Sequence, residues 1–324
     1  MCTTFTLQNN DLYVGRNLDL FASFREKVVV TPRNFSLSFF NGTIMDSHYA
    51  FMGMATVMDG VPMYAEAMNE KGIVVSGLQF AGNAHYFEWE EGKDNVAPFE
   101  MVSWILSQCQ NMQEVKVLVK KMNILNQAFK PEVPCSPLHW MICDASSCIV
   151  VESREDGLHV FDNPIGVMTN NPPFEFHQWN LNQYLNLTKE YPENRFSQNL
   201  QLKPFASGMG AMGLPGDASS PSRFVKAAFL KYNCNPGECE EDTIQQCFRI
   251  LLQVSMLKGS IDDLSGNQDY TTYSCVMNAT KGIYYYMTYE SMSIVKLEMN
   301  HLNLNQNELI CYTLNKRKEF LRGN

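Results

Sequence analysis

Cys2 stands directly after Met1, where removal of the methionine would give it a free α-amino group. Met aminopeptidase acts efficiently when the second residue is small, as cysteine is. An α-amine titrates near about 7.7–8.0 and a free thiol near about 8.5, so both groups can exchange protons near neutral pH. A thiolate attacks carbonyl carbon, and the adjacent amine could carry the proton. We therefore interpret Cys2 as a candidate nucleophile with its own base, the alternative being an incidental buried thiol.

Two charged side chains follow Cys2 on a predicted β-hairpin. Residues 2–7 and 12–19 are rich in strand-forming side chains and flank an Asn-Asn-Asp turn, which is typical of two antiparallel strands. Such a hairpin brings Arg16 and Asp19 back beside Cys2. Arg16 would place a fixed positive charge near the sulfur, and Asp19 could accept hydrogen bonds from the α-ammonium. An ordinary surface charge pair is the alternative.

The composition narrows the class of protein. The 324 residues are 45% hydrophobic and 18% charged, which is typical of a globular chain. The net charge of −9 argues against nucleic acid as a partner, because phosphate binding needs a basic surface. No basic and apolar leader opens the sequence, and no run of about 18 apolar residues could span a membrane. We therefore expect a soluble, cytoplasmic protein with no membrane partner.

Metal and cofactor chemistry has no support in the sequence. None of the ten cysteines forms C-x-x-C, and the six histidines have no ligand spacing. A disulfide framework is not expected in a large chain without a secretion signal. The chain also has no Gly-rich phosphate loop. We expect neither a metal nor a cofactor.

Strand and helix patterns occur in blocks along the chain. Strand patterns cover 48–57 and 72–80, and helical spacing covers 98–106 and 115–122. The next blocks are a hairpin over 138–152 with a third strand over 158–161, helices over 220–232 and 243–257, and strands over 270–277, 282–289 and 294–299. This order predicts one α+β domain over residues 1–324, with packed sheets and outer helices.

A hydrolase built on Cys2 also needs hydrogen-bond donors for the oxyanion. Gln79, at the end of a predicted strand, and Asn170, in Thr-Asn-Asn-Pro, are candidates through their backbone N–H groups and side-chain amides. Each could instead cap a strand end. Arg223 lies in the first turn of a predicted helix that Ser220 caps, where the macrodipole disfavours a cation. It would therefore pair with a specific carboxylate, in the site or in a structural ion pair.

Six motifs in order along the chain carry a family resemblance. They are the Met-Cys-Thr start, G-R-N-x-D over 15–19, M-N-E-K-G over 68–72, P-L-H-W over 137–140, T-N-N-P over 169–172 and G-L-P-G-D-x-S-S-x-S-R-F over 213–224. Together they resemble the choloylglycine hydrolase family, which contains the conjugated bile salt hydrolases and the penicillin V acylases. The similarity covers nearly the whole chain.

The resemblance implies an N-terminal nucleophile hydrolase with an αββα four-layer sandwich and, usually, a homotetramer. It implies that Cys2 is the nucleophile and its freed amine the base, with Arg16 and Asp19 flanking the sulfur and the amine. Asn170 matches an oxyanion-hole asparagine and Arg223 the arginine that completes the network. Gln79 departs from the pattern, since bile salt hydrolases usually have Asn there and penicillin V acylases Tyr. An amide side chain favours the first group.

A cleft for an apolar substrate is expected around Cys2. Its candidate lining residues are Leu18, Met58, Ala65, Phe129 and Val133, each of which could equally belong to the core. We predict a hydrolase of the amide bond that joins a bile acid to glycine or taurine. A penicillin V acylase and an inactive relative that only binds such amides are the alternatives.

Overall fold

The computed structural model describes residues 1–263, 266–318, 320 and 322–323. Among these residues, six antiparallel strands form a first sheet in the order β14-β1-β2-β15-β16-β17. Their bounds are Val167–Met168, Cys2–Asn9, Asp11–Leu20, Tyr270–Asn278, Ile283–Thr288 and Val295–Glu298. The predicted N-terminal hairpin is therefore confirmed, and it lies inside this sheet rather than at its edge.

A second antiparallel sheet of the described residues contains eight strands in the order β13-β12-β11-β8-β7-β6-β3-β18. Their bounds are Gly157–Asp162, Cys148–Arg154, Leu138–Cys143, Val74–Gln79, Val61–Asn69, Phe51–Met58, Lys27–Thr31 and Ile310–Thr313. Two short ribbons lie apart from both sheets: β4 (Leu37–Ser38) with β5 (Ile44–Met45), and β9 (Asp94–Val96) with β10 (Met122–Ile124).

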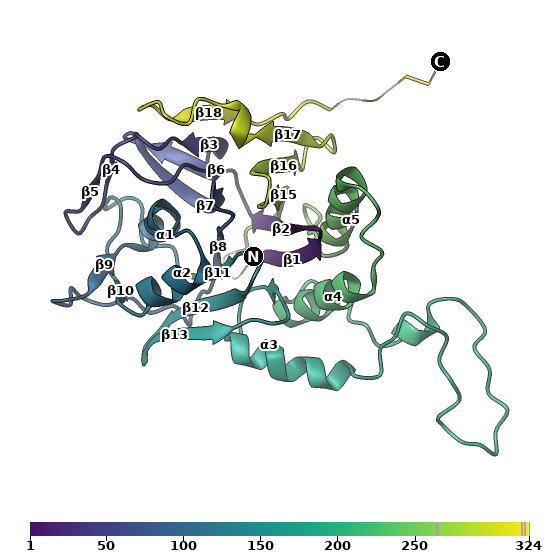
Figure 1. Cartoon of the computed structure of the whole chain (residues 1–324). Coiled ribbons are helices and arrows are strands. Elements are labelled where there is room, and N and C mark those ends of the chain that lie inside the picture. The colour runs from purple at the N-terminus through teal and green to yellow at the C-terminus, as the bar shows by residue number, and fades with distance from the viewer. Residues whose placement is uncertain (264–265, 319, 321, 324) are drawn as a thin grey trace.

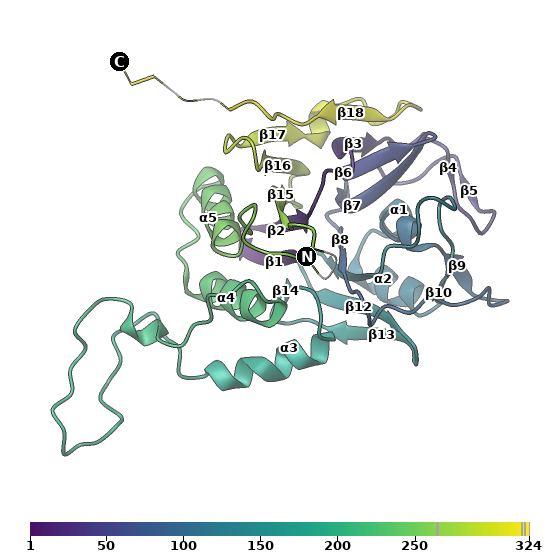
Figure 2. The same ribbon diagram turned by 180° about the vertical axis from the view of Figure 1, so that it is seen from behind.

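Helices cover the outer face of each sheet, which gives four layers (Figures 1 and 2). Helices α1 (Met101–Gln108) and α2 (Met112–Val119) pack on the second sheet, and α4 (Ser220–Asn233) and α5 (Glu240–Gln253) pack on the first. Helix α3 (Phe174–Asn180) adjoins α4, and the short 3₁₀ turns are η1 (Pro98–Glu100), η2 (Leu181–Tyr184), η3 (Met209–Ala211) and η4 (Met299–His301).

Burial between layers explains the strand sequences. Every residue of β15 and β16 is buried, because both faces of these central strands are covered. One apolar core lies between the sheets and under α4 and α5, and a second lies between the outer face of the second sheet and α1 and α2. The predicted order of strand and helix blocks is confirmed. Among the described residues, no helix is long and apolar enough to cross a membrane.

The helix boundaries differ from the predicted ones by up to four residues, and α2 spans Met112–Val119 in place of 115–122. Helix α5 begins at Glu240 because Cys239 caps it and three acidic residues favour the positive end of the dipole. It ends at Gln253, since the backbone N–H of Met256 donates to Thr271 Oγ1 instead of continuing the helix. In helix α4, Ser219 occupies the N-cap position predicted for Ser220, without a side-chain capping hydrogen bond, and Ser220 and Pro221 are the first two residues of the helix.

Candidate active site

Cys2 opens β1 and faces the second sheet. Its Cα is paired with that of Leu18 on β2, and Thr4 is paired with Arg16, so these four side chains share one face of the hairpin. Cys2 is 4% exposed, and Arg16 Nη2 lies 3.8 Å from its Sγ. The predicted approach of Arg16 to the sulfur is therefore present, in a buried setting and not as a surface charge pair.

Asp19 lies on the opposite face of β2, because side chains three positions apart along a strand point to opposite sides. Its Oδ1 accepts a hydrogen bond from Thr271 Oγ1 at 2.6 Å, and Thr271 is its Cα partner on β15. Burial raises the pKa of Asp19, although the charge of Arg223 opposes that rise. Its Oδ2 is buried and has no hydrogen-bond partner among the described residues.

Met1 is held over this region by the backbone of Asp19. The α-ammonium of Met1 donates to the Asp19 carbonyl at 2.6 Å, and the Asp19 N–H donates to the Met1 carbonyl at 2.8 Å. The same ammonium lies 3.4 Å from Asp269 Oδ2 and 3.5 Å from Gln79 Oε1. While Met1 is present, the nitrogen of Cys2 is an amide and cannot act as a base.

Asn170 joins the start of β1 to the end of β8. Its Oδ1 accepts from the Cys2 N–H and from Arg223 Nη2, each at 2.7 Å, and its Nδ2 donates to the Gln79 carbonyl at 2.7 Å. An amide NH₂ has two hydrogens, so one donor of Asn170 is left for another acceptor. Ser220, at the start of α4, fixes the backbone of Asn170 through a 2.8 Å hydrogen bond.

Arg223 is 2% exposed and donates to neutral oxygens. Nη1 contacts the Cys2 carbonyl at 2.5 Å and Thr3 Oγ1 at 2.6 Å, and Nε donates to the Ala218 carbonyl at 2.9 Å. The expected direct pairing with a carboxylate is wrong for the described residues, where Arg223 donates only to neutral oxygens and Asp19 acts on it as a nearby charge. Its hydrogen bonds replace the solvation that burial removes.

Gln79 ends β8 at the edge of the site. Its side chain is exposed, and its carbonyl faces Asn170. The N–H and C=O of a strand residue point toward the same edge, so the Gln79 N–H also faces this side. Its backbone and side chain are thus both turned toward the region above Cys2.

A cavity of about 570 Å³ opens above Cys2 and Arg16. All five residues predicted for a cleft line it: Leu18 from β2, Met58 and Ala65 from the β6–β7 hairpin, and Phe129 and Val133 from the segment after β10. Leu18 also belongs to the apolar core between the sheets, with Ala65 packed against it, and a role of the five residues in substrate binding stays a prediction. Gln79 also lines the cavity, whereas Asp19, Asn170 and Arg223 lie behind Cys2.

Several residues of the site were not predicted from the sequence. Glu66 forms an ion pair with Arg16 Nη1, while Arg16 Nη2 donates to the Gly77 carbonyl at 2.6 Å. Thr271 holds Asp19, and His177 Nε2 donates to the Asn170 carbonyl at 2.9 Å. These residues come from strands and helices distant in sequence, so no spacing near Cys2 indicates them.

His177 should make the fold sensitive to mild acid. Burial lowers the pKa of His177 to about 4, and its Nδ1 has no partner among the described residues. An unfolded histidine titrates near about 6.5, so its contribution to stability is complete above that pH and is lost as pH falls from 6.5 toward 4. We expect the free energy of unfolding to drop by about 2 kcal/mol between pH 7 and pH 5.

Urea unfolding at several pH values checks this expectation. His177→Gln is the matched control, because its amide can still donate to the Asn170 carbonyl but does not titrate. The variant should lose most of the pH dependence between pH 7 and pH 5. An equally steep dependence in the variant would assign the acid sensitivity to other groups.

Comparison with known proteins adds family information to this geometry. The family model for linear amide C–N hydrolases, choloylglycine hydrolase family, matches residues 2–312. A bile salt hydrolase/transferase of Lactiplantibacillus plantarum is 42% identical over 324 residues, covering 100% of both chains.

Solved structures agree with that match. A conjugated bile acid hydrolase variant from Clostridium perfringens superimposes with a TM-score of 0.92 at 36% identity, covering 100% of both chains. A penicillin V acylase from Agrobacterium tumefaciens gives 0.75 at 19% identity over 95% of this chain and 90% of its own, which concerns the fold alone. The predicted N-terminal nucleophile hydrolase fold is confirmed. The chain belongs to the choloylglycine hydrolase family of linear amide C–N hydrolases.

Proposed function

We propose that this chain hydrolyses the amide bond of bile acids conjugated to glycine or taurine, with Cys2 as nucleophile. The observation that carries the proposal is a buried thiol beside Arg16, both of them lining an apolar cavity of about 570 Å³. Two relatives that match 98–100% of this chain are named bile salt hydrolase/transferase, which supports this substrate class.

The catalytic cycle starts with the removal of Met1, which frees the Cys2 amine. The thiolate attacks the amide carbonyl, and the oxyanion accepts hydrogen bonds from the Gln79 N–H and from the second hydrogen of Asn170 Nδ2. The Cys2 amine passes the thiol proton to the leaving nitrogen of glycine or taurine. Water, activated by the same amine, then cleaves the thioester and releases the bile acid.

Each group in this scheme has a position that suits its step. Asn170 and Arg223 fix the backbone of Cys2 on both sides of its Cα, so the nucleophile does not rotate away. The cavity that Cys2 lines is also lined by Leu18, Met58 and Ala65, which suits an apolar ring system. Transfer of such a surface from water is favourable by roughly 25 cal/mol per Å².

Release of free amine from glycocholate, taurocholate and penicillin V tests the substrate class directly. Faster cleavage of the two bile salts is the expected result, and their ratio ranks the two conjugates. Cleavage of penicillin V alone would keep the mechanism and change the substrate class. Release from none of the three, together with a mass that retains Met1, would favour a protein that binds such amides without cleaving them.

Gln79→Asn should keep or raise bile salt hydrolysis, with kcat within about threefold of the parent or above it. The backbone N–H that we assign to the oxyanion survives the substitution, and the side-chain amide is only shortened by one methylene. Steady-state kinetics with glycocholate measure the effect. Gln79→Ala serves as the control for the side chain as a whole, and complete loss in Gln79→Asn would show that the length of Gln79 is essential.

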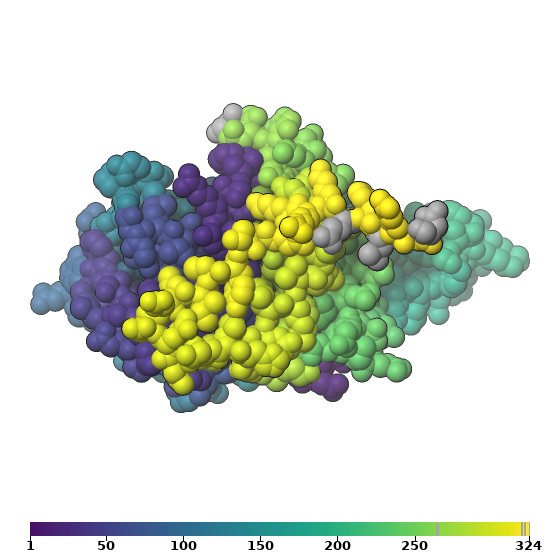
Figure 3. Space-filling model, turned by 90° about the horizontal axis from the view of Figure 1, so that it is seen from above, coloured from purple at the N-terminus to yellow at the C-terminus, as the bar shows by residue number. Residues whose placement is uncertain are grey.

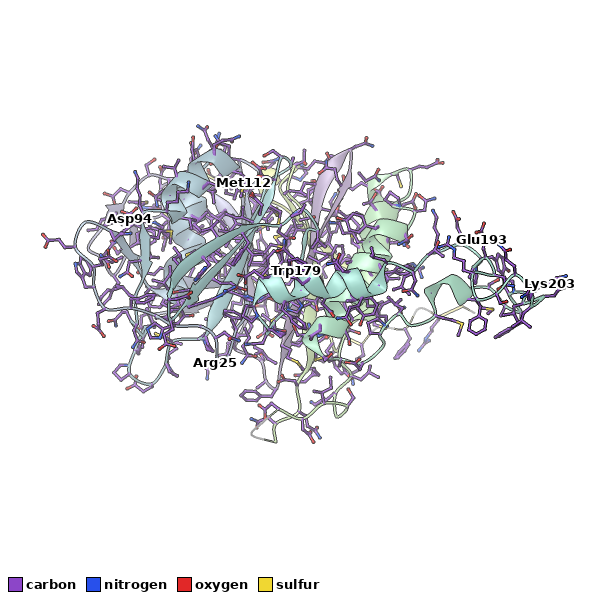
Figure 4. All side chains as sticks on the ribbon, turned by 90° about the horizontal axis from the view of Figure 1, so that it is seen from below. Arg25, Asp94, Met112, Trp179, Glu193 and Lys203 are labelled. Carbon is purple, nitrogen blue, oxygen red and sulfur yellow. The ribbon has the colours of Figure 1, made fainter. Side chains whose placement is uncertain are left out.

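The homotetramer and the cytoplasmic location stay predictions. One surface supports self-association: the segment between η2 and η3 extends away from the sheets as an arm, with Glu193 and Lys203 far from the body (Figure 4). The arm also stands clear of the molecule when it is viewed from above (Figure 3). Leu185, Phe196 and Phe205 on it are each more than four-fifths exposed, which is unusual for large apolar side chains.

A further inference from the structure

Glu66 is a fully buried carboxylate with no part in the catalytic cycle described above. It lies on β7, in the sheet that faces Cys2. Its Oε2 pairs with Arg16 Nη1 and accepts a hydrogen bond from the Tyr273 hydroxyl at 2.8 Å. Its Oε1 accepts from the Tyr284 hydroxyl at 2.7 Å and lies 3.5 Å from Cys275 Sγ.

This arrangement holds the carboxylate from two sheets at once. Glu66 belongs to the second sheet, and Tyr273 and Tyr284 belong to β15 and β16 of the first. Burial raises the pKa of both tyrosines well above the ordinary value, so their hydroxyls stay protonated and donate. A buried charge is tolerated when it is paired and hydrogen-bonded, and here both carboxylate oxygens are occupied. The position of Glu66 is therefore closely defined.

Arg16, by contrast, lies between Glu66 and the cavity, and it is buried with contacts on both sides. Nη2 donates to the Gly77 carbonyl and lies 3.8 Å from the Cys2 sulfur, which is the position that the proposed reaction needs. Arg16 also lines the cavity above Cys2, which is open to water. A guanidinium deprived of its carboxylate partner would be driven by desolvation toward that water and away from the sulfur.

We propose that Glu66, held by Tyr273 and Tyr284, is a positioning residue that keeps the Arg16 guanidinium against Cys2 Sγ. The inference rests on the proposed function only in taking Cys2 as the nucleophile. It assigns a role to the residues behind the thiol, where the Glu66 carboxylate of the second sheet contacts Arg16, Tyr273 and Tyr284 of the first. Substrate binding does not involve Glu66, because it does not line the cavity.

Glu66→Gln and Glu66→Asp test the inference, with Glu100→Gln as matched control. Glu100 is also buried, at 6% exposed, but its carboxylate accepts from the backbone of Phe40 and Ala97 beside the α1 layer. The readouts are the rate of Cys2 alkylation by iodoacetamide at pH 7, read on the N-terminal peptide by mass spectrometry, and kcat and KM for glycocholate. Thermal unfolding of each variant gives the folded fraction.

In folded Glu66→Gln we expect Cys2 alkylation and kcat to fall together by about 10- to 100-fold, with KM within about twofold of the parent. Glu66→Asp, which keeps the charge, should recover most of the loss. Glu100→Gln should alkylate at the parent rate. Alkylation needs no substrate, so this result stands even if bile salts prove not to be cleaved.

Three outcomes would overturn the inference. Cys2 in folded Glu66→Gln could be alkylated at the parent rate or faster, which would show that Glu66 balances the charge of Arg16 without positioning it. Glu100→Gln could lose as much activity per folded molecule as Glu66→Gln. If Glu66→Gln does not fold, the double variant Tyr273→Phe/Tyr284→Phe keeps every charge and should still lower the alkylation rate about three- to tenfold, so an unchanged rate there would contradict the inference.

Discussion

Cys2→Ala should lower bile salt hydrolysis by about 10⁵-fold or more, to the limit of detection, and leave the fold intact. The sulfur is the atom that bonds to the acyl group, so no neighbour replaces it. The contacts that anchor residue 2 use its backbone: the N–H donates to Asn170 and the carbonyl accepts from Arg223. Alanine keeps both, and removes one sulfur from the edge of a cavity where the lost packing is small.

Amine release from glycocholate and thermal unfolding, measured side by side, check this result. Cys109→Ala is the matched control, since that thiol is also buried but lies at the end of α1 on the outer face of the second sheet. It should lose some stability and keep its activity. More than about 1% of parent activity in folded Cys2→Ala would exclude a thioester mechanism on this residue.

Local patterns along the sequence predict much of the fold. The N-terminal hairpin, the strands near 138–162 and 270–299, and the helices near 220–253 all form where alternation and helical spacing place them. Strand β7 (Val61–Asn69) is not predicted, because Pro62 and Glu66 interrupt its apolar pattern. Its pairing with β6 and β8 is what makes it a strand, and Glu66 is tolerated there because Arg16 lies opposite in the other sheet.

The site is predictable only where its residues lie in one hairpin or match a motif. Arg16 and the cavity residue Leu18 follow from the hairpin, whereas no local pattern places Met58, Ala65, Phe129 or Val133 near Cys2. Which face of the sheet a side chain lies on can be predicted only from the strand register. Three positions separate Arg16 from Asp19, so their side chains lie on opposite faces, one near the Cys2 sulfur and the other near Thr271. Partners such as Thr271, more than 250 residues from Asp19, become neighbours only when the central strands pair.

Asp19 Oδ2, which has no hydrogen-bond partner among the described residues, bears on the removal of Met1. Oδ2 is buried without a partner among the described residues, although buried carboxylates normally accept hydrogen bonds on both oxygens. The α-ammonium of Met1 meanwhile donates a hydrogen bond to the backbone carbonyl of Asp19. Removal of Met1 would create a new ammonium on Cys2, and we expect this group to supply the donor that Asp19 Oδ2 lacks.

Asp19→Asn should therefore lower kcat by about 10²- to 10⁴-fold with little change in KM, because the substituted side chain no longer carries the charge that orients the Cys2 ammonium. Thr271 can still donate to the remaining carbonyl oxygen, so the loss of stability should be the smaller effect. Kinetics with glycocholate on protein shown by intact mass to lack Met1 measure the change, and Asp11→Asn at the opposite end of β2 is the matched control. If Asp19→Asn retains parent kcat, the Cys2 amine is oriented by Asn170 alone, and the buried charge of Asp19 serves only to balance Arg223.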